Sequence, residues 1–144
     1  MKNMQMIVVA AATLLMAGTA MAAGSATLNV TASVLGTCSM AGTGTMSFGL
    51  LDPTVAGATG SATSSGITIN CSNGTPYAVT SLSANGGLLM AGADSFAYTL
   101  TLPANGNGTG VAVAYNPTGA IAAGAFFSKP ANIYTDTVTL NITP

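Results

Sequence analysis

The chain reads Ala26-Thr27-Leu28-Asn29-Val30-Thr31-Ala32-Ser33-Val34 near its start, an unbroken alternation of apolar and polar side chains. Successive side chains of a β-strand point to opposite faces, so a two-residue period predicts a strand with one apolar and one polar face. The residues that share the apolar face are Ala26, Leu28, Val30, Ala32 and Val34.

The same alternation recurs in short runs along the rest of the chain. The clearest is 134–142, where the inward side chains would be Tyr134, Val138, Leu140 and Ile142. Further candidate strands are 45–51, 66–71, 77–82, 96–102 and 111–115, with a weaker one at 87–90. Turn-forming residues separate them at 56–65, 72–76, 84–87, 104–110 and 116–119. Seven or eight short strands, without helical periodicity, predict an all-β sandwich of two antiparallel sheets.

The first 22 residues have the features of a secretory leader. Lys2 precedes an apolar run, 6–16, and the small residues Ala20-Met21-Ala22 follow it. That order predicts a signal peptide over residues 1–22 and a mature chain that begins near Ala23. A membrane anchor is the alternative, but a spanning helix needs roughly 20 apolar residues. The remaining length suits one domain.

Charged side chains are almost absent after the leader. Lys129, Asp52, Asp94 and Asp136 are all that remain, and the chain has no Arg, Glu or His. A nucleic-acid partner is not expected, because phosphate binding needs cations. Most enzymes need a group that exchanges protons near neutral pH, or a metal ion. The sequence therefore predicts no enzyme, no catalytic residue, no metal, no cofactor and no small-molecule substrate.

The four charged residues have structural interpretations. Asp52 and Asp94 lie beside turn-forming residues and are expected to cap turns, and Lys129 is expected in an exposed turn. Asp136 falls in the inward register of 134–142, where an unpaired buried charge would be costly. Either burial begins only at Val138, the interpretation we favour, or Asp136 receives hydrogen bonds at the edge of the sandwich.

Cys38 and Cys71 are the two cysteines of the chain. An exported protein meets an oxidising compartment, where such a pair is normally bridged. Closing this loop stabilises the fold by roughly 3–4 kcal/mol on chain-entropy arguments. A metal site or a redox pair is the alternative, but the chain has no His and no closely spaced cysteine pair.

The alternating run 26–34 has two interpretations. It could be the first strand of a complete sandwich, or an arm that fills a missing-strand groove in another subunit by β-strand addition. Its place just after the leader, with Leu35-Gly36-Thr37 before Cys38, suits donation.

Several motifs together resemble the spore coat protein U family, which includes the major pilins of archaic chaperone–usher pili. They are the leader, the alternating arm, Gly36-Thr37-Cys38, Met46-Ser47-Phe48-Gly49, Ile67-Thr68-Ile69-Asn70-Cys71 and the alternating run 134–142. The order and spacing of these motifs carry the resemblance more than any one of them.

The resemblance implies an immunoglobulin-like sandwich that lacks one strand. A periplasmic chaperone would complete it temporarily, an outer-membrane usher would export it, and the arm of the adjoining identical or related subunit would replace the chaperone. The donor side chains would be Leu28, Val30, Ala32 and Val34, with Cys38 and Cys71 as the family's disulfide. The expected parts are a signal peptide at 1–22, a donor strand and hinge at 23–36 and a body at 37–144.

The expected function is therefore structural, as the subunit of a pilus that passes through the periplasm to the cell surface and serves adhesion or biofilm formation. Two alternatives stay open. One is a secreted spore-coat or matrix protein with a complete fold that does not exchange strands. The other is a carbohydrate-binding adhesin, which the absence of Trp disfavours because sugars stack on aromatic faces.

Overall fold

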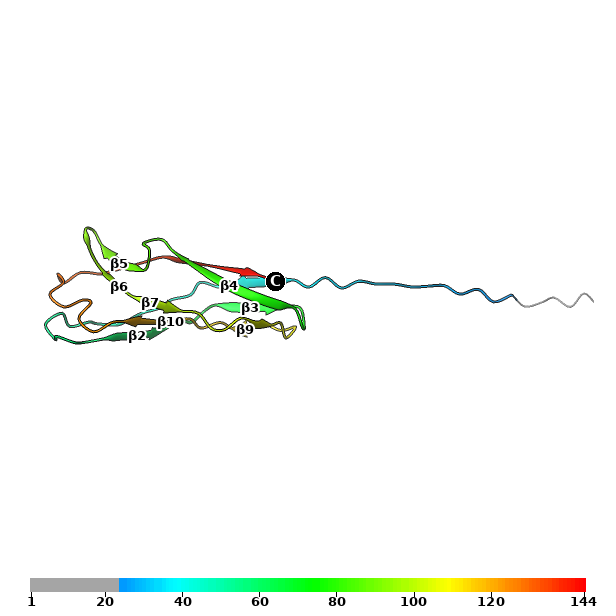
Figure 1. Cartoon of the computed structure of the whole chain (residues 1–144), viewed down its shortest axis with the longest axis horizontal. Coiled ribbons are helices and arrows are strands. Elements are labelled where there is room, and N and C mark those ends of the chain that lie inside the picture. Colours follow the sequence, from blue (N-terminus) through cyan, green and yellow to red (C-terminus); the bar gives the residue numbers. More distant parts are fainter. Residues whose placement is uncertain (1–23) are drawn as a thin grey trace, which may run out of the picture. The chain divides into compact units, whose positions relative to one another are not determined.

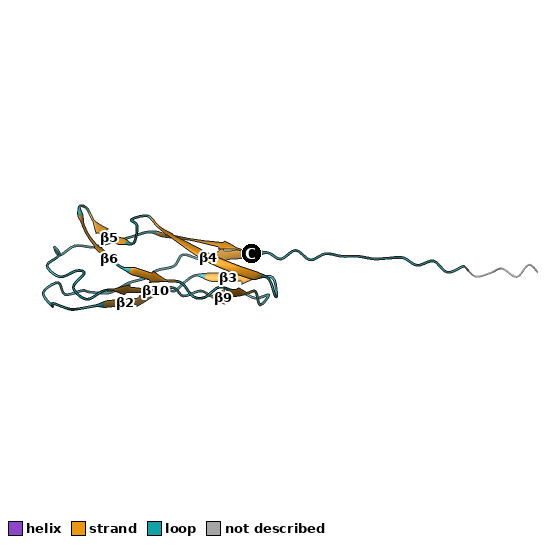
Figure 2. Cartoon of the chain, viewed as in Figure 1, coloured by secondary structure: helices purple, strands orange, loops and turns teal. Residues whose placement is uncertain are grey.

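The computed structural model describes residues 24–144, and the predicted signal peptide lies outside them. The chain divides into two compact units, Met1–Ala32 and Ser33–Pro144, and each is considered by itself. The described residues form strands and loops without a helix, as Figure 2 shows, and thus none that could cross a membrane. The predicted all-β class is confirmed.

Eleven strands make up the body. They are β1 (Cys38–Ala41), β2 (Gly60–Thr63), β3 (Thr68–Cys71), β4 (Pro76–Ser83), β5 (Leu88–Ala91), β6 (Asp94–Ala97), β7 (Thr99–Thr101), β8 (Gly106–Asn107), β9 (Val113–Ala114), β10 (Thr118–Ile121) and β11 (Val138–Thr143). All of their pairings are antiparallel.

One layer of the body contains two ladders, with the strand orders β1-β3-β9 and β2-β10-β7. They continue one another, because β2 leads into β3 and β9 leads into β10. Backbone hydrogen bonds bridge the break between them, from Ser64 N to Pro117 O (2.8 Å) and from Tyr115 N to Ile67 O (2.9 Å).

The opposite layer has the strand order β11-β4-β8. β11 pairs with β4 along its whole length, from Val138 opposite Ser83 to Thr143 opposite Ala78. The hairpin of β5 and β6 extends this layer through a bridge between Met90 and Thr135. Figure 1 shows β4, β5 and β6 on one side of the body and β2, β9 and β10 on the other. The result is the immunoglobulin-like sandwich that the sequence predicts.

The apolar core between the layers is small and divided. One cluster of buried side chains contains Ile69, Cys71, Val79 and Tyr115, and the other contains Phe96, Ile121 and Phe126. These seven are the buried hydrophobic residues of the described chain. Many other apolar side chains pack against a cluster while staying half exposed, so the body leaves much apolar surface in contact with water.

The disulfide between Cys38 and Cys71 is confirmed. It joins directly opposite residues of β1 and β3, and thus fastens the first strand of the body to its neighbour. Thr37 adds to this attachment, because its amide donates to the Ser72 hydroxyl at 3.2 Å and its carbonyl accepts from the Ser72 amide at 2.9 Å.

Several strand predictions are confirmed. The runs 66–71, 77–82 and 87–90 correspond to β3, β4 and β5, and the end of 134–142 is β11. The run 111–115 shortens to the two residues of β9. The turn predicted at 84–87 lies between β4 and β5, and that at 72–76 lies between β3 and β4 except for Pro76, the first residue of β4.

Other predictions are wrong, and the reasons are physical. The run 96–102 divides at Tyr98 into β6 and β7, which belong to different ladders, and 45–51 forms only the bridge between Thr45 and Ser65. The predicted turns 56–65, 104–110 and 116–119 contain β2, β8 and part of β10. These strands consist mostly of Gly, Ala, Ser, Thr and Asn, so their pairing depends on backbone hydrogen bonds rather than on side chains that a sequence pattern reveals.

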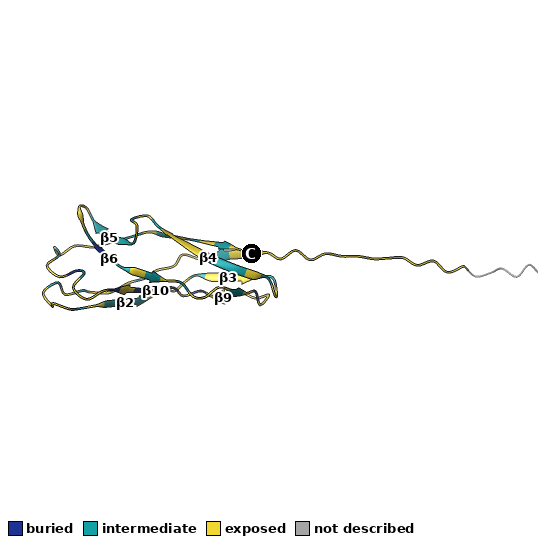
Figure 3. Cartoon of the chain, viewed as in Figure 1, coloured by how far each residue is buried: buried dark blue, intermediate teal, exposed yellow. Residues whose placement is uncertain are grey.

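The alternating run 26–34 is not a strand within the single chain. Residues 24–37 are loop in Figure 2 and exposed in Figure 3. Strand backbone needs a hydrogen-bonded neighbour, because its donors and acceptors point sideways and not along the chain. The predicted pattern is present here without a partner.

Candidate functional site

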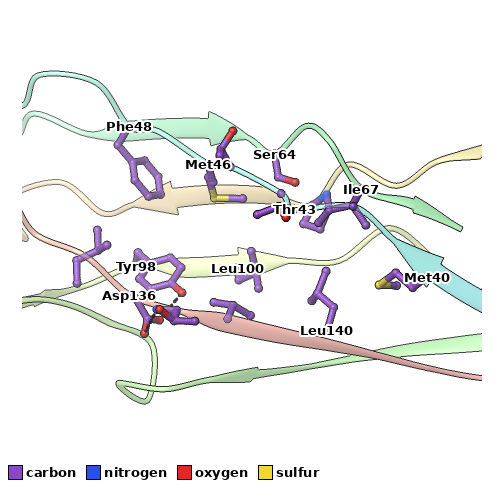
Figure 4. Close-up of a pocket in the computed structure, with 17 residues that line it drawn as sticks. Met40, Thr43, Met46, Phe48, Ser64, Ile67, Tyr98, Leu100, Asp136 and Leu140 are labelled. Atoms are coloured by element: carbon purple, nitrogen blue, oxygen red, sulfur yellow. Dashed lines mark hydrogen bonds between the residues drawn. The ribbon is translucent and has the colours of Figure 1, made fainter.

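An open groove of about 550 Å³ lies in the body, between the segment Met40–Phe48 and β11. Its lining residues are Met40, Gly42, Thr43, Gly44, Thr45, Met46, Phe48, Ser64, Ile67, Leu89, Tyr98, Leu100, Pro117, Asp136, Thr137, Val138 and Leu140. Figure 4 shows the side chains that surround it. We call this space the groove.

Two edge strands border the groove. β1 is the outer strand of the ladder β1-β3-β9, and β11 is the outer strand of the ladder β11-β4-β8. β1 and β11 are neighbours in space, yet in the described chain no strand pairing joins them. Each therefore presents an edge of unpaired backbone donors and acceptors toward the other, and such edges readily accept a further strand.

The two borders run in opposite directions. β1 starts at the end of the body where Cys38 lies opposite Cys71 and where β11 finishes opposite Ala78. The segment Met40–Phe48 then leads away from this end to Phe48, whose ring centroid is 6.1 Å from that of Tyr98. The Tyr98 hydroxyl donates a hydrogen bond to Asp136, which precedes the first residue of β11 by two positions. The groove thus has a base end near Cys38 and Thr143 and a far end near Phe48 and Asp136.

Local sequence places apolar side chains along both borders of the groove, beside polar residues such as Thr45 and Thr137. Alternation along β11 turns Val138 and Leu140 inward while Thr139 and Asn141 are exposed. Met40, Ile67 and Leu140 pack against the first core cluster, and Phe48, Leu89 and Tyr98 pack against the second. The groove therefore lies between the two halves of the divided core, and an apolar strand inserted there would join them.

Glycines allow the wall of the groove to approach the floor. A side chain at Gly42 would collide with the carbonyl oxygen of Gly66, and both glycines have positive φ, of 100° and 89°. A side chain at Gly44 would collide with Ile67. A methyl group at Gly119 of β10 would lie 2.7 Å from the Phe48 ring. The missing side chain at Gly119 thus leaves room for Met46 and Phe48 against β10.

Ser64 is a buried polar residue of the lining. Its side chain is 6% exposed, and its hydroxyl has no hydrogen-bond partner within the described residues. Figure 4 shows it between Met46 and Ile67 along the groove.

A polar network borders the far end of the groove. Asp136 accepts hydrogen bonds from the hydroxyls of Ser83 (2.6 Å) and Tyr98 (2.7 Å) and from the backbone amides of Asn85 (3.1 Å) and Thr137 (2.8 Å). The favoured interpretation of Asp136 is therefore wrong, since Asp136 is half-buried and hydrogen-bonded although β11 begins at Val138. The alternative, a hydrogen-bonded carboxylate at the edge of the sandwich, is correct.

The network changes the pKa values of its members. Burial acts to raise the pKa of Asp136, but the hydrogen bonds from Ser83, Tyr98, Asn85 and Thr137 outweigh it and leave this pKa below its usual value. Burial, followed by the hydrogen bond to Asp136, raises the pKa of Tyr98 to about 12. Asp136 is therefore the charged member of the network at neutral pH, and Tyr98 stays a donor.

We expect Asp136→Asn to weaken the pH dependence of folding stability. Because the pKa of Asp136 is lower in the folded chain than in the unfolded chain, where it is about 3.9, ionised Asp136 stabilises the fold at pH values above about 3.9. This contribution disappears as the pH falls through the pKa of the folded state. The variant should show a smaller drop in melting temperature between pH 7 and pH 3, followed by circular dichroism. At pH 7 it should lose only about 1 kcal/mol, because the Tyr98 hydroxyl can turn to accept from the new amide. Asp94→Asn, outside the network, is the matched control, and an equal effect there would contradict the assignment.

The other charged residues are dispersed. Asp52 caps its turn by accepting from the amide and the hydroxyl of Thr54 (2.9 and 2.7 Å), and these hydrogen bonds lower its pKa. Asp94 opens β6 beside the turn of the hairpin. Lys129 is half exposed just after a turn. The structure does not bring the three carboxylates together.

The predicted donor side chains are exposed in the single chain. The exposed fraction is 85% for Leu28, 82% for Val30 and 93% for Val34, and Ala32 is exposed as well. The body thus offers two open backbone edges above an apolar floor, and residues 26–34 offer an unpaired strand pattern.

The family model of the Spore Coat Protein U domain matches residues 24–116. The chain belongs to the spore coat protein U family. The matched region begins with the alternating run and continues through the disulfide and β9. The spore coat protein U family consists of structural, pilin-type proteins of extracellular fibres and surfaces, associated with the subunits of chaperone–usher pili. No curated protein sequence matches the chain.

The sequence predicted a missing-strand groove but not the residues that line it. The residues of β11 and the segment 45–51 were predicted as strands, but which strands form the edges of a sheet depends on topology. A signal was present in Gly42, Gly44 and Gly66, since glycines beside predicted strands indicate a close approach of backbones.

Proposed function

We propose that the chain is the structural subunit of an extracellular pilus, in which residues 26–34 of one copy fill the groove of the next. The groove between the edge strands β1 and β11 is the observation that carries this proposal. Because some Cα atoms of β1 and β11 lie within 8 Å of each other, the two strands must move apart to admit a strand between them. The inserted strand could then hydrogen-bond to both edges and cover the apolar floor.

The arm matches the groove in chemistry and in period. Leu28, Val30, Ala32 and Val34 recur every second residue, as do the inward residues of β11. In neighbouring antiparallel strands, directly opposite side chains share a face. Four donor side chains could therefore enter the groove together, each large one contributing about 1.5–3 kcal/mol and Ala32 less.

The direction of insertion follows from where each body begins. The body of a copy starts at Thr37, at the base end of its own groove. If an incoming arm ran parallel to β11, the body attached to it would lie at that same base end. It would then compete for space with the accepting copy's own arm, which leaves its body there. An arm antiparallel to β11 instead leads to the far end, so the copies join head to tail into an open fibre. Val34 then lies nearest Asp136, and Leu28 nearest the base end.

A partner is needed before assembly. An uncovered groove with two open edges promotes aggregation. A periplasmic chaperone that temporarily supplies a strand, and an outer-membrane usher that exports the subunit, meet this need. The finished fibre would serve adhesion or biofilm formation at the cell surface.

One experiment tests the proposal against a coat protein with a complete fold. The mature chain is compared with a variant that lacks residues 23–34 and with the same truncated variant carrying 23–34 after Pro144 through a short flexible linker. Because β11 ends at the base end, the appended copy can fold back antiparallel to it as a hairpin. We expect the truncated body to aggregate and the linked copy to restore a soluble monomer, measured by size-exclusion chromatography. A truncated body that is stable and monomeric would support the coat protein.

A further inference from the structure

Two highly exposed apolar residues lie in the chain just beyond the residues that end the groove. One border continues beyond Phe48 to Leu50, whose side chain is 105% exposed, and the other reaches back from Asp136 to Ile133, which is 82% exposed. Neither side chain belongs to the two core clusters. Each border of the groove therefore continues along the chain into an exposed apolar residue.

The connection between arm and body is short. Only Leu35 and Gly36 separate Val34, the last donor residue, from Thr37, which is hydrogen-bonded to Ser72. Three Cα to Cα steps span at most about 11 Å. An arm inserted up to Val34 must therefore bring the base of its own body within about 11 Å of the groove exit.

The connection is also held in place and carries an apolar side chain. A methyl group at Gly36 would lie 2.8 Å from the Thr75 hydroxyl oxygen, so the backbone here passes close to the loop before β4. Leu35 is 80% exposed and lies next to Val34, so it falls outside the donor alternation. It would otherwise remain in water at the place where two bodies meet.

We propose that Leu35 of an incoming copy packs between Leu50 and Ile133 of the copy that accepts its arm. This inference rests on the proposed function and adds a second contact to it, outside the groove. The partner is another copy of this chain, because the short connection leaves room for little else at the exit. The contact seals the open end of the groove and restricts the angle between consecutive bodies.

The test uses fibres collected from cells that produce the full chain with benzoylphenylalanine, a photo-crosslinking residue, in place of Leu35. After irradiation, we expect mass spectrometry to locate the crosslinks at residues 49–51 and 132–134 of a neighbouring copy. The double variant Leu50→Ser, Ile133→Ser should still form fibres, because its groove is intact. Its yield of these crosslinks should be at least about tenfold lower. Leu82→Ser is the matched control, since Leu82 is 69% exposed on β4 and does not line the groove.

The outcomes separate this inference from the proposed function. Crosslinks that map elsewhere on the neighbouring copy, or that persist in the double variant, would overturn the junction and leave donation intact. Failure of the unmodified chain to form fibres, or fibres from a chain without residues 23–34, would overturn the proposed function and the junction with it.

Discussion

Val30→Asp is expected to abolish fibre formation and to leave the groove uncovered, as removal of the arm does. Val30 is 82% exposed in the single chain, so the substitution removes no packing there. In the fibre it would replace a buried apolar side chain by a charge without a partner in the apolar groove. The lost burial and the desolvated carboxylate together cost about 4 kcal/mol or more, which corresponds to about a thousandfold weaker association. Electron microscopy and size-exclusion chromatography of the secreted protein measure the result.

Thr31→Asp is the matched control for this variant. It introduces the same charge one residue along the arm, on the polar face of the alternation. An inserted strand would direct this side chain to solvent, so Thr31→Asp should assemble into fibres like the unmodified chain. Loss of fibres in both variants would show that charge on the arm, rather than the face it occupies, prevents assembly, and would contradict the donor register.

The sequence predicted best where side-chain alternation and burial agree. In β11, Val138, Leu140 and Ile142 are half-buried while Thr139 and Asn141 are exposed, as the two-residue period requires. Cys38 and Cys71 could be paired from their export and their number, because no other cysteine competes. Such features depend on local pattern or composition alone.

The remaining features depend on contacts that are distant in sequence. Asp136 was assigned to the wrong environment, because its hydrogen-bond donors Ser83 and Asn85 come from the end of β4 and the turn after it. β2 and β10 were missed because their residues are small and polar, and their pairing with each other gives them their strand character. The groove depends on β1 and β11 being edges, which is a property of the whole topology.

The divided core gives the groove a role in stability as well as in assembly. The groove side chains Leu140 and Ile67 belong to one apolar cluster and Phe48 and Leu89 to the other, so water in the groove reaches both. An inserted arm would bury apolar surface on both sides at once. Subunit stability and fibre formation are therefore expected to change together when the groove is altered.

Leu140→Asp is expected to prevent the groove from accepting an arm, while the arm of the same chain can still insert into another copy. Leu140 lines the groove from β11 and is half-buried, so a carboxylate there would be desolvated when an arm enters. The expected loss is again about 4 kcal/mol of association free energy. Thr139→Asp, on the exposed face of the same strand, is the matched control and should leave assembly unchanged. Circular dichroism distinguishes lost assembly from an unfolded body.

Mixing the two defective chains gives the sharpest result. A Val30→Asp chain has an intact groove without a usable arm, and a Leu140→Asp chain has an intact arm without a usable groove. Donation in one direction then allows a single productive contact, in which the Leu140→Asp chain inserts its arm into the Val30→Asp chain. Refolding an equimolar mixture from denaturant should therefore yield stable 1:1 heterodimers and no longer polymer, measured by native mass spectrometry. Fibres from the mixture, or two chains that never associate, would contradict donation, because only head-to-tail exchange between arm and groove ends at two subunits.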